Sequence, residues 1–196
     1  MYLGRFIFAL FLVIIVLSFN IGFGQDSATD KSDQAEGGFC VEFIGQVHFV
    51  QGRLVELQKA VPQEKYSWRP AEGVRSISEV YLHATMANYY FTKFTGYEVP
   101  KDIDADMAPD KWDTMTTDKN EITKVLERSF ADLIVTAQKI TESDLEKNVH
   151  VFGMDMTLRN FMVSSLNHLH EHLGQSIAYA RSNGVTPPWS IKEETN

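Results

Sequence analysis

The 196-residue sequence has a single cysteine, Cys40, so the chain can form no internal disulfide. We expect this residue to lie half-buried near the start of the first helix. The sequence also lacks a GxGxxG pattern and any glycine-rich phosphate loop. Basic residues are few: 18 Lys and Arg stand against 26 Asp and Glu, for a net charge of −8. A sequence-independent grip on nucleic acid requires a basic surface, so these charges argue against nucleic acid as a partner.

Hydrophobic runs long enough to span a membrane are also lacking. The apolar stretch from Phe6 to Phe19 is shorter than the roughly 20 residues that a spanning helix needs. It follows Arg5, and Gly22-Phe23-Gly24 places small residues at positions −3 and −1 of a signal-peptidase site. We therefore predict a signal peptide over residues 1–24, with no stable membrane insertion after cleavage. An uncleaved N-terminal anchor is the alternative, and in both cases the domain is exported, to the periplasm or the medium.

Residues 25–38 are polar, small and acidic, and we interpret residues 25–39 as a disordered linker. The remaining sequence has almost no pattern typical of β-strands, and it has no internal repeat. The whole chain is 44% hydrophobic and 22% charged, which is ordinary for a globular protein. Its length is sufficient for one domain with a sizeable core.

Apolar residues recur every three or four positions in four segments, the spacing that places them on one face of a helix. We predict helices over about residues 41–61, 76–96, 118–140 and 157–182. The second opens with Ser76-Ile77-Ser78-Glu79, a capping box in which Ser76 is the N-cap. Four such helices predict an all-α protein, a four-helix bundle over residues 40–190, followed by a tail over residues 191–196.

The connections between these helices are predicted to be irregular. Residues 63–75 and 98–117 are interpreted as loops, and residues 148–155 as a short extended piece that turns at Gly153. The predicted walls of a substrate pocket are the aromatic residues Trp68, Tyr89 and Tyr90.

The segment from Asn167 to Gln175, in the last predicted helix, contains three histidines within five residues. Consecutive residues of an α-helix lie about 100° apart around its axis. His168 and His172 therefore stack on one face, with Cβ atoms roughly 5–6 Å apart, whereas His170 points about 160° away from His172. Two imidazoles at positions i and i+4 are a common way for a helix to offer two ligands to a divalent metal.

A metal site needs at least one further protein ligand, and we expect His83 to supply it. This residue lies four positions before Ala87 and borders the inward face of the second predicted helix. The small residues Ala84 and Ala87 leave room beside it for a neighbouring helix or a pocket. Of the other histidines, we expect His48 to be a boundary or core residue and His150 to be exposed or to cap a turn.

Three histidine ligands leave open coordination positions, which is typical of catalytic rather than structural metal sites. The expected cofactor is a divalent metal ion, with Zn, Ni, Fe and Mn as candidates. If the ion is zinc, the pKa of its bound water falls toward about 7, and that water can act as hydroxide or give way to a thiolate. The segment is not a zincin motif, because His170-Glu171 would require a second histidine where Gly174 stands. Glu171 is interpreted as a surface residue.

Two other interpretations stay open. The histidines can fill semi-polar positions at the edge of the core, although burying several imidazoles without partners costs free energy. Alternatively, a metal can pin the second helix to the fourth in a non-catalytic metal-binding or interaction module. Access distinguishes an enzyme from such a module, because an enzyme needs an open coordination position that faces a cleft, whereas a metal that only pins the helices would be closed over.

The chain resembles the DinB-like family of four-helix-bundle metalloproteins, which includes YfiT-type proteins, over about residues 43–189. In that family one ligand histidine follows a capped helix start, as His83 follows Ser76 here. The other two come from a late helix with the string N-H-x-x-x-H-x-G-Q, which is matched by Asn167, His168, His172, Gly174 and Gln175. The segment that follows is also similar, in Gly184, Pro187, Pro188 and Trp189.

The resemblance implies that His83, His168 and His172 hold a divalent metal near one end of the bundle. It also implies a homodimer, since many members are dimers, and a small-molecule substrate, since several members are thought to transfer low-molecular-weight thiols. We therefore expect a metal-dependent hydrolase or thiol transferase in which the metal activates water or a thiol. No catalytic acid or base can be named from the sequence.

Overall fold

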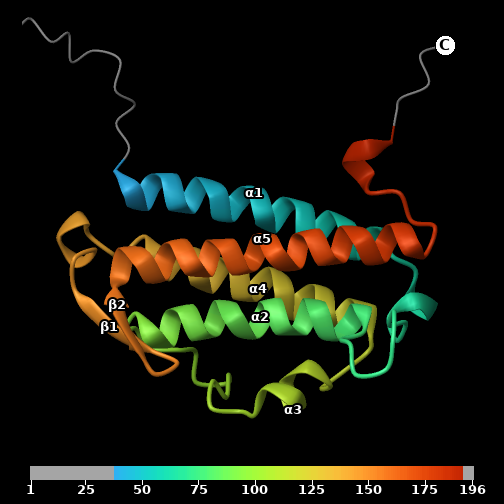
Figure 1. Cartoon of the computed structure of the whole chain (residues 1–196), viewed down its shortest axis with the longest axis horizontal. Coiled ribbons are helices and arrows are strands. Elements are labelled where there is room, and N and C mark those ends of the chain that lie inside the picture. The colour runs from blue at the N-terminus through green and yellow to red at the C-terminus, as the bar shows by residue number, and fades with distance from the viewer. Residues whose placement is uncertain (1–37, 192–196) are drawn as a thin grey trace, which may run out of the picture. The chain divides into compact units, whose positions relative to one another are not determined.

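The computed structural model of the chain describes residues 38–191 (Figure 1). Its four long helices are α1 (Phe39–Ala60), α2 (Ile77–Phe94), α4 (Lys119–Ala137) and α5 (Leu158–Ser182). They form the all-α four-helix bundle that the sequence predicts. The predicted signal peptide, nearly all of the predicted linker and the end of the predicted tail lie outside the described residues. None of the described helices is both long and apolar enough to cross a membrane.

The position of each helix in the bundle differs from its order in the chain. α1 packs against α4 and α5, and α2 packs against the same two helices. α1 and α2 therefore occupy opposite corners of the bundle, although they follow each other in the sequence. Figure 1 shows α1 and α5 running in one direction and α2 and α4 in the other. This arrangement brings α2 and α5, the helices that contain the predicted metal ligands, side by side.

Local sequence signals determine where the helices begin and end. Ser76 accepts a hydrogen bond from the backbone N–H of Glu79, and the Glu79 carboxylate accepts one from the backbone N–H of Ser76. This reciprocal pair is the predicted capping box. Asp118 caps α4 by accepting hydrogen bonds from two backbone N–H groups of its first turn. α4 ends at Ala137, and the chain continues to the predicted end at Ile140 with i→i−3 hydrogen bonds.

The core of the bundle is built from the apolar stripes that the sequence predicts. Val47, Val50, Leu54 and Leu57 of α1 are all fully buried. The facing stripes of α4 and α5 are buried in the same way, through Ile122, Leu126, Leu133, Leu158, Met162 and Leu169. Each fully buried side chain of this size stabilises the fold by about 1.5–3 kcal/mol relative to leaving it exposed. The packed core gives the candidate site a rigid support.

The connection over residues 98–117, predicted as a loop, contains a short helix, α3 (Pro109–Asp113). Pro109 is its first residue, where the missing backbone N–H of proline has no cost. Trp112 holds α3 against α2, because its side chain is buried and its Nε1 donates a hydrogen bond to the Leu82 carbonyl at 2.9 Å. The prediction of irregular structure was wrong here because a tertiary contact, rather than local periodicity, determines the conformation.

Residues 148–157 form a β-hairpin, as the predicted extended piece and its turn at Gly153 indicate. Strand β1 (Asn148–Val151) pairs antiparallel with β2 (Met154–Thr157). The two-residue turn has positive φ at Phe152 (49°) and Gly153 (80°), the signs of a type I′ turn, which suits the twist of a hairpin. The hairpin lies against α2 and α5 at one end of the bundle (Figure 1).

The described fold is completed by three short 3₁₀ helices, η1 (Gln63–Lys65), η2 (Glu142–Asp144) and η3 (Pro188–Ser190). After η1, Tyr66 turns inward, where it is fully buried and its hydroxyl donates a hydrogen bond to the Gln58 carbonyl at 2.8 Å. Cys40 is half-buried in the first turn of α1, as predicted.

Candidate metal centre

The side chains of His83, His168 and His172 converge between α2 and α5. One ligand nitrogen can be chosen from each ring so that all three lie within 4.8 Å of one another. The ring centroids are 5.3 Å apart for His83 and His168 and 4.9 Å apart for His83 and His172. Those of His168 and His172 are 4.4 Å apart. The structure thus brings together the three histidines that the sequence singles out.

Helix geometry explains why the rings meet. On α5, the i, i+4 spacing stacks His168 and His172 so that their Nε2 atoms lie 3.2 Å apart. Two nitrogens bound at 2.0–2.1 Å to a tetrahedral zinc ion lie about 3.4 Å apart, so this spacing suits a shared ion. His83 reaches the same point from the second turn of α2, which packs alongside α5.

The hydrogen bonds of His172 determine which of its nitrogens faces the other rings. Its Nδ1 lies 3.0 Å from Oε1 of Gln175, whose Nε2 donates a hydrogen bond to the Tyr179 hydroxyl at 3.0 Å. Because a carboxamide oxygen can only accept, Nδ1 of His172 donates the proton and Nε2 retains its lone pair. That lone pair faces His168, which is the tautomer needed to bind a metal through Nε2.

Asp113 of α3 supports His83 in a similar way. Its Oδ1 lies 3.3 Å from Nδ1 of His83, and its Oδ2 accepts a hydrogen bond from Nε of Arg75 at 2.7 Å. Burial acts to raise the pKa of the Asp113 carboxyl, but the hydrogen bonds from His83 and Arg75 hold that pKa below its ordinary value. The ionised carboxylate can therefore orient the ring, as carboxylates behind metal-binding histidines commonly do.

Burial makes the paired imidazoles of α5 weak bases. Burial first, and then the neighbouring His172 and His83, lower the pKa of His168 to about 4. Burial also lowers the pKa of His172, even though the hydrogen bond to Gln175 acts in the opposite direction. Both rings are therefore neutral at pH 7, the form in which histidine binds metals.

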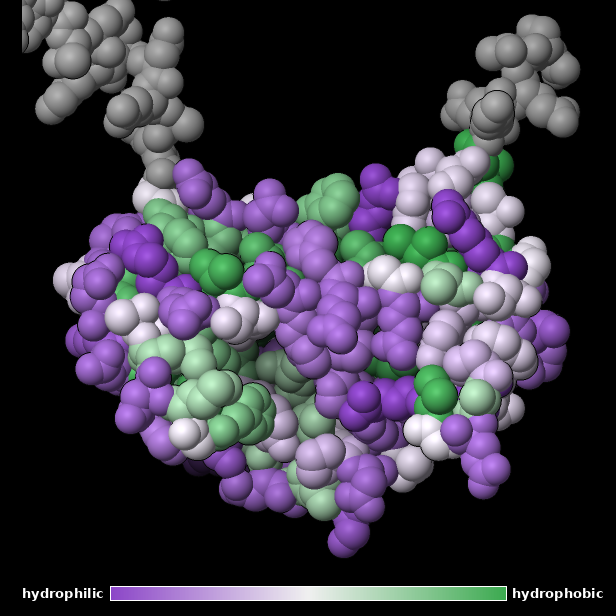
Figure 2. Space-filling view, in the orientation of Figure 1, coloured by the Kyte–Doolittle hydropathy of each residue, from purple (hydrophilic) through white to green (hydrophobic). Residues whose placement is uncertain are grey.

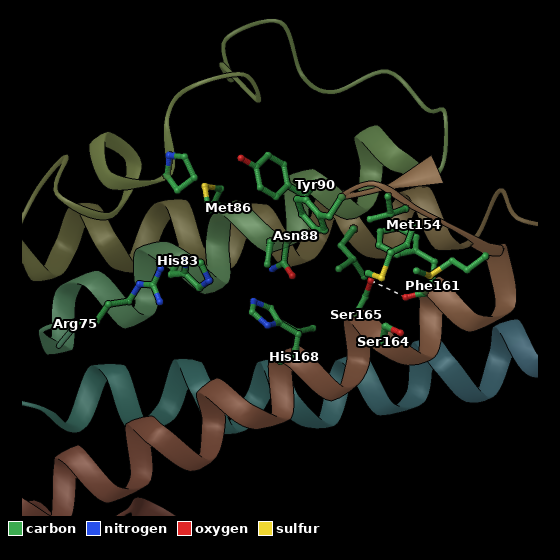
Figure 3. Close-up of a pocket in the computed structure, with 17 residues that line it drawn as sticks. Arg75, His83, Met86, Asn88, Tyr90, Met154, Phe161, Ser164, Ser165 and His168 are labelled. Carbon is green, nitrogen blue, oxygen red and sulfur yellow. Dashed lines mark hydrogen bonds between the residues drawn. The ribbon is translucent and has the colours of Figure 1, made fainter. Parts of the chain in front are cut away.

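A cavity of about 490 Å³ opens beside these rings (Figure 3). His83 and His168 form part of its wall, whereas His172 lies behind them and is 5% exposed. In Figure 3 the ring of His168 points from α5 toward α2, and Met154 of the hairpin lies at the opposite end of the cavity. Figure 2 shows a hollow on this side of the molecule, next to hydrophobic side chains near the hairpin. The candidate site is therefore open to small molecules.

The wall of the cavity also includes the buried carboxamide of Asn88. Its Nδ2 donates a hydrogen bond to Oγ of Ser129 at 3.0 Å, and that hydroxyl donates to the Leu126 carbonyl at 2.9 Å. These bonds fix the orientation of the amide. Oδ1 of Asn88 has no hydrogen-bond partner among the described residues, so the fold itself leaves this acceptor unused.

Of the three predicted pocket walls, only Tyr90 lines the cavity. Tyr89 is fully buried and packs edge-on against Trp112, with ring centroids 5.9 Å apart. Trp68 packs edge-on against Tyr179 at 5.4 Å. The predictions for Tyr89 and Trp68 were wrong because burial alone does not show which neighbour an aromatic ring faces. Adjacent residues of a helix differ by about 100° in direction, so Tyr89 faces α3 while Tyr90 faces the hairpin.

The remaining histidines of the described chain lie away from the site. His170 faces α1, where its ring lies against Phe49 with centroids 6.4 Å apart. His48 is exposed, so the prediction of a boundary or core position was wrong; it lies on the outer side of α1. His150 and Glu171 are both exposed, as predicted.

Asp113 and Gln175 are the supporting residues of this site, and the sequence indicated only part of their role. Gln175 belongs to the string shared with the DinB-like family, but its contact with His172 was not predicted. Asp113 was missed altogether, because it lies in the segment interpreted as a loop. The proline at position 109 followed by Trp112 was the available signal, since proline favours the first position of a helix and a tryptophan tends to be buried.

Three imidazoles converge between two helices of an all-α bundle, and a cavity reaches two of them, His83 and His168; together these features define a candidate metal site. The sequence profile of the DinB superfamily matches residues 46–176, which is about two-thirds of the chain. The chain therefore belongs to the DinB superfamily, as its resemblance to DinB-like proteins predicts.

Individual relatives agree with this assignment. YjoA of Bacillus subtilis, an uncharacterized protein, is 26% identical over 144 residues, which are 71% of this chain and 88% of YjoA. A DinB-like protein from Bacillus cereus has a similar structure, with a TM-score of 0.64, 19% identity and coverage of 76% of this chain and 95% of that protein.

YfiT of Bacillus subtilis is similar in structure as well. It is described as a probable metal-dependent hydrolase with an unusual four-helix bundle topology. Its TM-score is 0.61 at 14% identity, and the match covers 79% of this chain and 93% of YfiT. At these identities the structural likenesses establish the fold.

Proposed function

We propose that this protein is a metal-dependent enzyme in which His83, His168 and His172 hold one divalent ion and a small molecule is hydrolysed beside it. The observation that carries the proposal is access, because the cavity of about 490 Å³ reaches His83 and His168. Structural metal sites have all their positions filled by protein ligands, whereas catalytic sites keep one open. The description of YfiT as a probable metal-dependent hydrolase also supports this proposal.

The donor set suits a divalent transition metal. Three neutral imidazoles can bind Zn, Ni, Fe or Mn, and they leave at least one position for water or substrate. The Nε2 lone pair of His172 has no hydrogen-bond donor assigned to it other than the Nε2 of His168. A shared cation would take the lone pairs of both Nε2 atoms, in place of a hydrogen bond between the two neutral rings.

A divalent ion at such a site supplies Lewis acidity, which polarises a substrate carbonyl and makes water a better nucleophile near neutral pH. The chain's own residues orient and enclose the reaction. Gln175 and Asp113 hold the rings of His172 and His83 in one tautomer. In hydrolysis, the oxygen of water bonds to the carbonyl carbon, the bond from that carbon to the leaving group breaks, and a proton of the water goes to the leaving group. No carboxylate lines the described cavity, so we assign no catalytic base.

The test uses the full chain, stripped of metal with a chelator and reloaded separately with Zn, Ni, Fe or Mn. We expect hydrolysis of p-nitrophenyl acetate, or of another simple ester or amide, to disappear on chelation and return with one of these metals. The variant His168→Ala should lose both metal binding and hydrolysis. His150→Ala, which changes an exposed histidine of the hairpin, should retain both.

Two results would contradict the proposal. One is hydrolysis that is the same in the wild type and in His168→Ala. The other is metal binding that stabilises the wild type against unfolding but supports no reaction with any of these substrates, as expected of a non-catalytic module.

A further inference from the structure

The cavity beside the histidines is mostly apolar. Away from Arg75 and the imidazoles, much of its wall is made of methionine, aromatic and aliphatic side chains, among them Met86, Met156, Leu133 and Phe161. Thioether side chains are flexible and polarizable, so a methionine-rich wall adapts to apolar groups of several shapes. A volume of about 490 Å³ lies in the range of sites that hold small organic molecules.

Charge is the second feature of the cavity. Arg75 is the one side chain of its described wall that is charged at all ordinary pH values, and Arg75 is already paired with the buried carboxylate of Asp113 at 2.7 Å. An anionic group of a ligand would compete with this carboxylate for the guanidinium. Besides apolar groups, the rest of the wall offers only neutral polar side chains, such as those of Asn88, Ser164 and Ser165, so a buried anion would lose its hydration without gaining a cationic partner, which costs free energy. The cavity therefore favours uncharged ligands.

The hairpin extends the apolar surface to the outside. Phe152 at its tip is 68% exposed, and Met154 is 57% exposed, yet both line the cavity. The ring of Phe152 lies over Tyr90 and Phe94, with centroids 5.8 Å and 5.1 Å away. An apolar ligand thus meets a continuous apolar path from the mouth of the cavity to its interior (Figures 2 and 3).

We propose that the substrate carries an uncharged apolar group, of the size of an aryl group or a medium-length acyl chain, which fills this cavity while the reacting bond lies beside His83 and His168. This inference rests on the proposed function for the reaction itself. Binding of the apolar group, however, depends only on the cavity. It can therefore be tested in the metal-free protein.

Two dyes with the same skeleton provide the test. N-phenyl-1-naphthylamine is neutral, and 8-anilino-1-naphthalenesulfonate differs from it by one sulfonate. We expect the metal-free full chain to bind one molecule of the neutral dye, with a rise in fluorescence, and at least about tenfold more tightly than the anionic dye, because the sulfonate would be buried without a partner. Equal affinities, or tighter binding of the sulfonate, would overturn the proposal.

A matched pair of variants locates the dye. Ala87→Phe places a ring inside the cavity, whose wall includes Ala87, and should weaken binding of the neutral dye by about tenfold or more, because the ring takes up its space. Ala178→Phe makes the same change at an exposed position of α5 and should leave the affinity unchanged. Circular dichroism establishes that both variants are folded. An Ala87→Phe protein that is folded and binds the dye as tightly as the wild type contradicts the proposal.

Methionine methyl resonances give a readout in the wild type that requires no substitution in the cavity. The neutral dye should shift the ¹³C-methyl signals of Met86, Met154 and Met156, which line the cavity, and leave those of Met115 and Met162 in place, which do not. Shifts confined to Met115 or Met162 would place the dye elsewhere and overturn the inference. Dye binding without hydrolysis would support the preference of the cavity and contradict the proposed reaction. Hydrolysis without dye binding would support the reaction and contradict the preference of the cavity.

Discussion

Oε1 of Gln175 lies 3.0 Å from Nδ1 of His172 and thereby turns the Nε2 lone pair of that ring toward His168. Gln175 touches neither of the other two histidines in the hydrogen-bond network, so it acts through His172 alone. It is a positioning residue. Loss of this contact should therefore lower the affinity for the metal, while the three histidine ligands remain in place.

Replacing Gln175 by methionine should weaken zinc binding about 10–100-fold, the usual range for the loss of a partner behind a metal-binding histidine. Gln175→Glu keeps an acceptor oxygen at the same place and should bind zinc much more tightly than the methionine variant. Calorimetric titration of the metal-free proteins measures both. If the two variants bind zinc with the same affinity, Gln175 does not orient His172.

Asp113→Asn should weaken zinc binding about tenfold or more, because the amide oxygen is a poorer acceptor for His83 than the carboxylate and the ion pair with Arg75 is lost. Asp110→Asn changes an exposed aspartate of the same short helix and is the matched control. Equal zinc affinities for the two variants would exclude a supporting role for Asp113.

The metal-free protein should lose stability as the pH falls from about 6.5 to about 4. The pKa of His168 is about 4 in the folded chain and close to 6.5 in the unfolded chain. In this window the unfolded state binds more protons, so acid favours unfolding, by up to about 1.4 kcal/mol per pH unit for each such histidine. The stabilising effect of the neutral ring is fully present above pH 6.5 and is lost as the pH falls through the folded pKa.

Urea unfolding of the chelated protein at several pH values measures this effect. Other groups titrate in the same window, so the informative quantity is the difference in unfolding free energy between the wild type and His168→Leu. As the pH falls, the wild type should lose more stability than the variant, so the difference should shift in favour of His168→Leu. A difference that does not change with pH would show that His168 is not kept neutral by burial.

The predicted export signal leads to a separate experiment. When the full gene product is made in a host that exports it, intact-mass analysis should find a mature chain that begins at Gln25, because cleavage is expected after Gly24. A product that retains residues 1–24 and remains with the membrane would support the alternative of an uncleaved anchor.

The homodimer implied by the family resemblance stays a prediction, which sedimentation of the mature chain would test.

The bundle and the three histidines could be predicted because both depend on helical periodicity. The stripe of Val47, Val50, Leu54 and Leu57 is sufficient to identify α1 and its buried face. The i, i+4 spacing of His168 and His172 likewise fixes a shared direction before any tertiary contact is known.

The remaining features depend on tertiary contacts that leave no regular pattern. Asp113 reaches His83 only because Trp112 anchors α3 to the Leu82 carbonyl of α2. The cavity likewise depends on where the hairpin rests, and its strand residue Met156 has no helical spacing to identify it. A single sequence shows which residues are buried along one helix, but not which irregular segment covers them.

The most direct test of the metal site is the number of divalent ions that each chain binds, measured by elemental analysis and by titration of the metal-free protein. We predict one ion per chain in the wild type, none measurable in His83→Ala, and one in His48→Ala, which changes an exposed histidine of α1. If His83→Ala binds the metal as tightly as the wild type, the imidazole from α2 is not a ligand and the site described above does not exist.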